Sequence, residues 1–161
     1  MSAHTGQTVF FGANDAVLEG LPQHVPLEEY RTNLYTIVTH EALQGHKPKL
    51  ILITPAPICE YKTQDKKIHK QRMAARTKEY VDVALEVGKE ANIPTVNLWN
   101  AFMAYAGWSE GEPLPGCKTQ PKNERLGALL RDGMSLCYRP VRVCPRPYTN
   151  KDRPSLYVKG L

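Results

Sequence analysis

The stretch TVFFGANDA, residues 8–16, decides the fold of this chain. It begins with a short continuous apolar run, which is typical of a strand covered on both faces of a parallel sheet. The run ends at Gly12, where a glycine permits a close backbone turn. Asn14 and Asp15 follow, so an amide and an acid stand just after the strand. Because ligands bind beyond the carboxyl ends of strands in open parallel sheets, this turn is the first candidate site.

The rest of the chain predicts alternating helices and strands. Residues 27–43 carry apolar side chains at helical spacing, and Pro26 stands where that helix begins. KLILITPAP predicts a second buried strand that is stopped by two prolines. The remaining elements are a long helix over residues 65–92, a strand over 93–99, a short helix over 100–106 and a last helix that starts at 124 and ends near 132. This order is typical of right-handed crossovers in a parallel sheet.

Composition excludes several functional classes. The chain has 161 residues, enough for one domain with a core, and no apolar run long enough for a membrane span. Its start lacks the features of a secretory signal, which predicts a cytoplasmic protein. The net charge of +5 is concentrated in residues 62–78 and in the last thirty residues. We interpret the first cluster as the solvated face of a helix rather than a phosphate site, and no nucleic-acid motif accompanies it.

The metal-ligating residue types show no pattern of a metal site. His40 and His46 are six residues apart and cannot share one face of a helix. The cysteines lack any C-x-x-C pairing, so we expect free thiols rather than a disulfide framework or a zinc site. They are Cys59, Cys117, Cys137 and Cys144. No metal and no cofactor is predicted.

Asn14 has two interpretations on the local sequence. Its neutral N–H donor suits an oxyanion hole, where one well-placed hydrogen bond is worth roughly 3 to 4 kcal/mol in a transition state. Alternatively, Asn14 and Asp15 merely cap the turn that follows the strand. The local residues favour capping, and the wider pattern of the chain favours the oxyanion hole.

That wider pattern resembles the GDSL/SGNH hydrolases, and within them the isoamyl acetate-hydrolysing esterases. FFGANDA and PLEEY are the most specific stretches, and KLILITPAPICE, VNLWNAFMAYAGWSEGEPLPG and LLRDGMSL support them. The resemblance covers about residues 8–132. It implies an α/β fold of the three-layer, flavodoxin-like type, in which helices flank a parallel sheet. It also implies lipase-like hydrolysis of small carboxylic esters through a serine acyl-enzyme, without metal or cofactor.

The resemblance assigns three residues to the site. Asn14 would donate its side-chain amide to the oxyanion, and Gly12 would shape the turn that carries it. Asp132 would be the acid that orients the histidine base. The partner implied is a small-molecule ester.

The chain also departs from the family pattern. The match begins at the family's third block, so neither the Gly-Asp-Ser block nor the glycine of the second block has a counterpart among the seven residues before Thr8. Ser135 stands where the family has histidine. We therefore expect an SGNH domain that is incomplete at both ends, and a chain that is inactive alone. Residues 1–133 would form this partial domain, and residues 134–161 an irregular tail that is disordered or out of frame.

Codon degeneracy allows a specific explanation for the tail, residues 134–161. Codons can be chosen for Met134 to Val143 that place a histidine after Asp-Gly-x when they are read one nucleotide later. We hypothesise that the chain leaves its ancestral frame near Met134, through a frameshift, an alternative splice or a gene-model error. Sequencing the transcript tests this hypothesis.

Ser109 offers an apparent substitute for the missing nucleophile. GWSEG, residues 107–111, matches the G-x-S-x-G pattern of a nucleophile elbow. That elbow requires a strand before the serine and a helix directly after it. Here a predicted helix precedes Ser109 and EPLPG follows it, so we interpret it as a loop serine.

Two other functions stay open at this stage. The chain could be a non-catalytic binding or regulatory protein that pairs through an unfilled sheet edge or through its basic tail. It could also be a gene fragment without an independent role. A missing strand would leave an apolar edge exposed, which predicts marginal stability.

Overall fold

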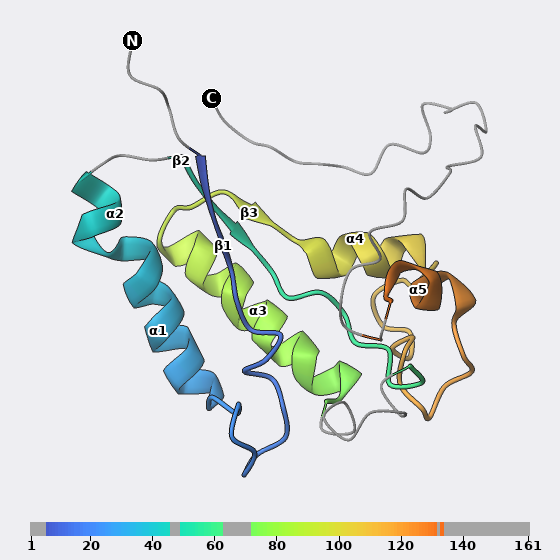
Figure 1. Cartoon of the computed structure of the whole chain (residues 1–161). Helices are drawn as coiled ribbons and strands as arrows, with labels where there is room; N and C mark the ends of the chain where they lie inside the picture. Colours follow the sequence, from blue (N-terminus) through green and yellow to red (C-terminus); the bar gives the residue numbers. More distant parts are fainter. Residues whose placement is uncertain (1–5, 46–48, 63–71, 132, 134–161) are drawn as a thin grey trace, which may run out of the picture.

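The computed structural model describes residues 6–45, 49–62, 72–131 and 133. Within them, three strands form a parallel sheet in the order β1-β2-β3 (Figure 1). The strands are β1 (Gly6–Phe10), β2 (Lys49–Ile53) and β3 (Thr95–Val96). The expected α/β architecture with a parallel sheet is confirmed.

Two helices pack along the sheet on one side of the strands. The helices α1 (Leu27–Thr39) and α3 (Ala74–Glu90) contact each other, and both bury apolar side chains in the main core (Figure 1). Val9 of β1 and Leu52 of β2 are register partners and point into this core. The other core residues are Ala16, Tyr30, Leu34, Val38, Tyr80, Ala84 and Val87.

The predicted helix over residues 27–43 is divided in two. Its first part is α1, and its second part is the short helix α2 (Glu41–Gly45). His40 lies between them with an extended backbone, at a ψ of 136°. Its ring nitrogen Nδ1 accepts a hydrogen bond from the backbone N–H of Ala42 at 3.2 Å. Residue 40 therefore ends one helix and caps the next.

The long helix begins later than predicted. Residues 65–71 lie outside the described part of the chain, and α3 starts at Ala74. Arg72 precedes it in an isolated antiparallel bridge with Val17 and is only 4% exposed. The prediction that the basic stretch is a solvated helix face is therefore wrong at Arg72, because its guanidinium turns inward to bind the loop after β1.

Two shorter helices complete the described fold. The helix α4 (Leu98–Tyr105) begins after Asn97, whose Oδ1 accepts the N–H of Asn100 at 2.9 Å. The helix α5 (Glu124–Leu129) begins after Asn123, whose Oδ1 accepts the N–H of Leu126 at 2.9 Å. Such caps satisfy donors that have no partner inside the helix. The backbone is extended at residue 130, so α5 is shorter than predicted.

The second face of the sheet is exposed. Phe10 and Val96 are 44% and 43% exposed, and Ile53 lies between them as the register partner of both. The next residue after β1, Phe11, is 53% exposed. The prediction that the first strand is covered on both faces is therefore wrong. In the part of the chain that the structure describes, β1 is an edge strand of the sheet. The helices α1 and α3 cover the face that carries Val9, and Phe10 points to the other face.

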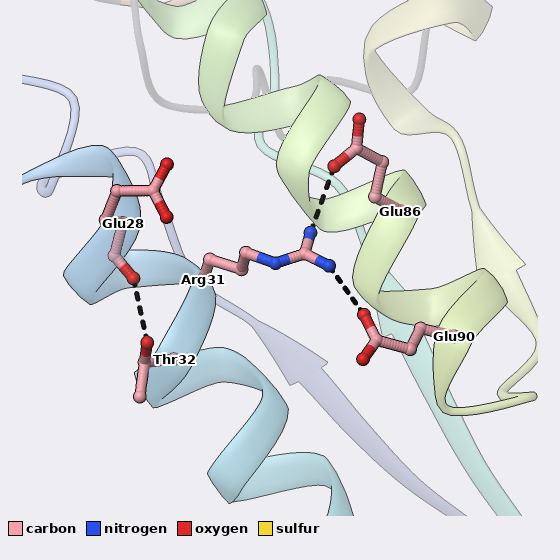
Figure 2. A network of polar contacts seen from close by, with 5 residues as sticks. All are labelled: Glu28, Arg31, Thr32, Glu86 and Glu90. Atoms are coloured by element: carbon pink, nitrogen blue, oxygen red, sulfur yellow. Dashed lines mark hydrogen bonds and ion pairs between the residues drawn. The ribbon is translucent and has the colours of Figure 1, made fainter.

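An ion-pair network joins α1 to α3 on the molecular surface. The guanidinium of Arg31 binds Glu86 at 3.0 Å and Glu90 at 2.6 Å, and the hydroxyl of Thr32 donates to the carbonyl of Glu28 (Figure 2). These side chains are exposed, so each pair contributes at most about 1 kcal/mol. The apolar core beneath holds the two helices together. No helix of the described residues combines the length and apolar character that crossing a membrane requires.

Candidate active site

The turn after β1 is built around Gly12. Its φ of 108° lies in the region that favours glycine. A Cβ at this position would lie 2.6 Å from Cγ of Pro55 and 2.8 Å from the hydroxyl of Tyr30. The packing around Gly12 therefore leaves no space for a side chain at this position. Pro55 follows β2, so the ends of both strands meet at this point.

Asp15 closes the turn. One of its carboxylate oxygens accepts the backbone N–H of Gly12 at 3.0 Å, and its carbonyl accepts the N–H of Val25 at 3.3 Å. Nδ1 of His24 also lies 3.3 Å from that carbonyl. Capping, which the sequence offered as the second interpretation of this pair, is therefore performed by the Asp15 side chain.

Asn14 has a different environment. Its side chain is exposed, and its Oδ1 accepts a hydrogen bond from Nη2 of Arg72 at 2.9 Å. Its backbone carbonyl accepts the N–H of Val17 at 3.3 Å, which completes the turn. The carboxamide thus projects at the carboxyl end of β1, with its oxygen held by a cation.

Arg72 holds the loop that carries Asn14. Its Nε lies 3.3 Å from the carbonyl of Ala13, and its Nη2 lies 3.0 Å from Oε1 of Gln23. Burial lowers the pKa of Arg72, because the charged form loses hydration. Sequence reasoning missed this residue: its partners are distant along the chain, and nothing in its own stretch distinguishes it from the neighbouring basic residues.

Tyr30 supports the turn from α1. Its hydroxyl donates to the carbonyl of Phe11 at 3.3 Å. Burial raises the pKa of Tyr30 well above its usual value, and the charges of Asp15 and Tyr80 raise it further. The hydroxyl therefore stays protonated and acts as a fixed donor rather than as a base.

A pocket of about 330 Å³ opens beside the turn, between it and α1. Apolar side chains supply most of its lining, and Asp15 contributes a carboxylate shared with the turn. The lining residues are Phe11, Asp15, Val25, Tyr30, Asn33, Leu34, Thr36 and Ile37. Small apolar groups would fit this space better than charged ones.

The segment after β2 leads toward the third predicted site residue. Residues 54–59 are all buried, and the N–H of Cys59 donates to the carbonyl of Gly133 at 2.9 Å. Asp132, predicted as the orienting acid, lies outside the described residues. The role of Asp132 stays a prediction, as do those of Asn14 and Gly12.

Ser109 lies in the loop between α4 and α5. Its backbone N–H donates to the Glu112 carboxylate at 2.9 Å, and its carbonyl accepts the N–H of Glu112 at 3.1 Å. The residue is exposed, and α4 rather than a strand precedes it. The geometry of a nucleophile elbow is therefore not present around Ser109. Among the described residues, no cluster of three or more His, Cys, Asp or Glu could hold a metal ion.

The chain is similar in sequence and in fold to known esterases and lipases. The chain is 37% identical over 136 residues to the isoamyl acetate-hydrolyzing esterase 1 homolog of Rattus norvegicus, covering 80% of this chain and 48% of that protein. It is 31% identical over 150 residues to a GDSL esterase/lipase of Arabidopsis thaliana, covering 86% and 61%. A lipase/acylhydrolase crystal structure from Enterococcus faecalis matches 80% of this chain and 51% of its own, with 28% identity and a TM-score of 0.54. No family model matches the chain.

The parallel sheet with helices along it is an α/β fold of the SGNH type, the fold of the lipase/acylhydrolase neighbour. The chain is homologous to the GDSL/SGNH hydrolases, and its named relatives are esterases and lipases. It spans about half the length of the relatives that it matches.

Proposed function

We propose that this chain supplies an oxyanion-hole donor of a carboxylic-ester hydrolase for small acetate-type esters. Asn14 donates a side-chain N–H to the negative charge that develops on the ester carbonyl oxygen. Gly12 sets the direction of the turn. Asp132 would orient the histidine base of a complete site, although this chain has Ser135 at that histidine's position. The reaction is acyl transfer to a serine followed by hydrolysis.

One observation carries this proposal: the Asn14 carboxamide is exposed at the carboxyl end of β1 while its oxygen is bound by Arg72. The amide nitrogen is thereby the atom presented to a ligand. A side-chain donor held by the protein before the substrate arrives needs no reorganisation during the reaction. The mostly apolar pocket beside the turn suits a small, uncharged ester better than an anionic substrate; its lining includes Asp15 but not Asn14.

We infer further that the 161-residue chain hydrolyses esters slowly, if at all, when it is alone. In the part of the chain that the structure describes, the one serine is Ser109, and it lies in the loop between α4 and α5. An oxyanion hole without a serine–histidine pair retains only a small fraction of the catalysis of a complete site.

A chimera tests the role of Asn14. Residues 6–133 of this chain would replace the matching part of the rat relative, and hydrolysis of isoamyl acetate would be measured. Asn14→Ala should lower kcat by about 10²- to 10³-fold, because one oxyanion donor is lost. Asn100→Ala, the same substitution at an exposed position of α4, should leave kcat unchanged. If both variants keep the kcat of the chimera, Asn14 is not an oxyanion donor.

A non-catalytic binding protein is the second candidate. The apolar row of exposed Phe10 and Val96 with half-buried Ile53 between them favours it. Such a row suits contact with another protein. A p-nitrophenyl ester assay on the esterase chimera, together with a pull-down on the chain alone, separates the two candidates. Turnover that Asn14→Ala abolishes supports the enzyme. No turnover, together with a stable partner in a pull-down, supports the binding protein.

A further inference from the structure

The guanidinium of Arg72 can bind only one of the two ends of the Asn14 carboxamide. An arginine side chain carries five N–H donors and no acceptor. A carboxamide has an acceptor oxygen on one branch and a donor nitrogen on the other. The 2.9 Å contact between Nη2 of Arg72 and the Asn14 side chain therefore requires the oxygen, Oδ1, at that position. Rotating the amide by half a turn would place two sets of donors against each other.

The position of Arg72 makes this preference strong. The side chain is only 4% exposed, so water competes little for its donors. A hydrogen bond that involves an ionised partner is stronger than one between neutral groups. The same guanidinium also binds the carbonyl of Ala13, the residue before Asn14, at 3.3 Å. Arg72 thus contacts both the backbone and the side chain of the segment that it orients.

We propose that Arg72 is a positioning residue for Asn14: it fixes the orientation of the carboxamide so that the amino group faces the ester oxygen. This inference rests on the proposed function, in which Asn14 is the oxyanion donor. A cationic donor on Oδ1 also draws electron density from the amide and makes its N–H groups better donors. Arg72 therefore acts on both the direction and the strength of the donor, without touching the substrate.

Nuclear magnetic resonance of the full chain tests the proposal, because it reports on the Asn14 amide without requiring activity. The side-chain NH₂ signals of Asn14 are assigned by their loss in Asn14→Asp. In Arg72→Gln these signals should move upfield, and their proton exchange with water should become faster. Glutamine both donates and accepts, so it no longer selects one orientation.

Two matched variants separate positioning from general loss of structure. Arg72→Lys retains a cation that only donates, so the Asn14 signals should stay closer to the wild type than in Arg72→Gln. Gln23→Ala removes a second acceptor of the same Nη2 and should leave the Asn14 signals in place. If Arg72→Gln keeps the backbone spectrum and the Asn14 signals do not move, the proposal is wrong.

A measurement on the unmodified chain covers the case in which Arg72→Gln does not fold. The NH₂ protons of Asn14 should give nuclear Overhauser contacts to neighbours other than the guanidinium, because the oxygen faces Arg72. Strong contacts between these protons and the Arg72 Nη protons would overturn the proposal. A failure of this kind differs from a failure of the proposed function, which the Asn14→Ala variant of the esterase chimera reports independently of Arg72.

Discussion

The two faces of the sheet differ although the same strands supply both. On one face, Val9 and Leu52 are 7% and 1% exposed and pack against α1 and α3. On the other, Phe10 and Val96 are 44% and 43% exposed. All four side chains are apolar, so the difference lies in what covers them. Apolar residues in a strand indicate that its faces can be buried. The packing of the helices determines which face is buried.

The face of the sheet that α1 and α3 cover therefore contributes much of the free energy of unfolding, and the exposed face contributes little. Burying an apolar side chain yields about 1.5 to 3 kcal/mol relative to leaving it exposed. The residues that face α1 and α3 contribute most of this stabilisation. The turn at Gly12 lies at the end of the same face, in contact with Tyr30. The substitutions below measure how large the difference between the faces is.

The largest effect is expected for Gly12→Ala. The added methyl would clash with Pro55 and Tyr30, and the backbone would keep a φ of 108° that alanine tolerates poorly. Strain and overpacking together should lower the free energy of unfolding by about 4 kcal/mol. Gly20→Ala is the control, because Gly20 also has a positive φ but nothing within 4 Å of its Cβ position. Urea unfolding should show a loss of only about 1 kcal/mol there, the cost of a side chain at a positive φ, and equal losses would mean that the turn is not crowded.

The next largest effect compares two neighbouring residues of β2. Leu52→Ala removes a side chain that is 1% exposed and should cost about 3 kcal/mol. Ile53→Ala acts on the opposite face and should cost about 1 kcal/mol, because its environment is only partly buried. The measurement is the free energy of unfolding in urea for both variants. Similar losses would show that the second face is as well packed as the first.

The sequence was a good guide to the elements of the sheet. Continuous apolar stretches predicted β1 and β2, and Pro55 correctly marked the segment after β2 as non-strand. Periodicity placed the start of α1 at Leu27. These features depend on neighbours along the chain, which is why local patterns predict them.

The sequence was a poor guide to contacts between distant segments. Arg72 stands among other basic residues, and its burial depends on a loop 58 positions away in the chain. The exposure of Phe10 depends on how the helices pack, which the strand itself does not encode. At the candidate site, the residue types of the turn were recognisable, but the contact that orients Asn14 was not.

A smaller effect is expected for Tyr30→Phe, at the rim of the covered face. Removing the hydroxyl that donates to Phe11 should cost about 1 kcal/mol at neutral pH. Burial raises the pKa of Tyr30 in the folded chain, so the unfolded chain loses this proton first as the pH rises above about 10. The wild type should therefore lose stability above that pH, by up to about 1.4 kcal/mol per pH unit for this group. Urea unfolding at pH 8 to 11 should show a shallower decline in Tyr30→Phe, and parallel curves would contradict the burial of this hydroxyl.

The smallest effect is expected for Val96→Thr, which replaces a methyl by a hydroxyl of similar size on the exposed face. Water can hydrate the new hydroxyl at a position that is 43% exposed, so the free energy of unfolding should change by less than about 0.5 kcal/mol. The same substitution at Val9, 7% exposed, buries the hydroxyl and should cost about 2 kcal/mol. Because shape and β-propensity are matched, the difference between the two values isolates burial. Equal costs would mean that another part of the protein covers Val96 in solution, and that the two faces of the sheet are alike.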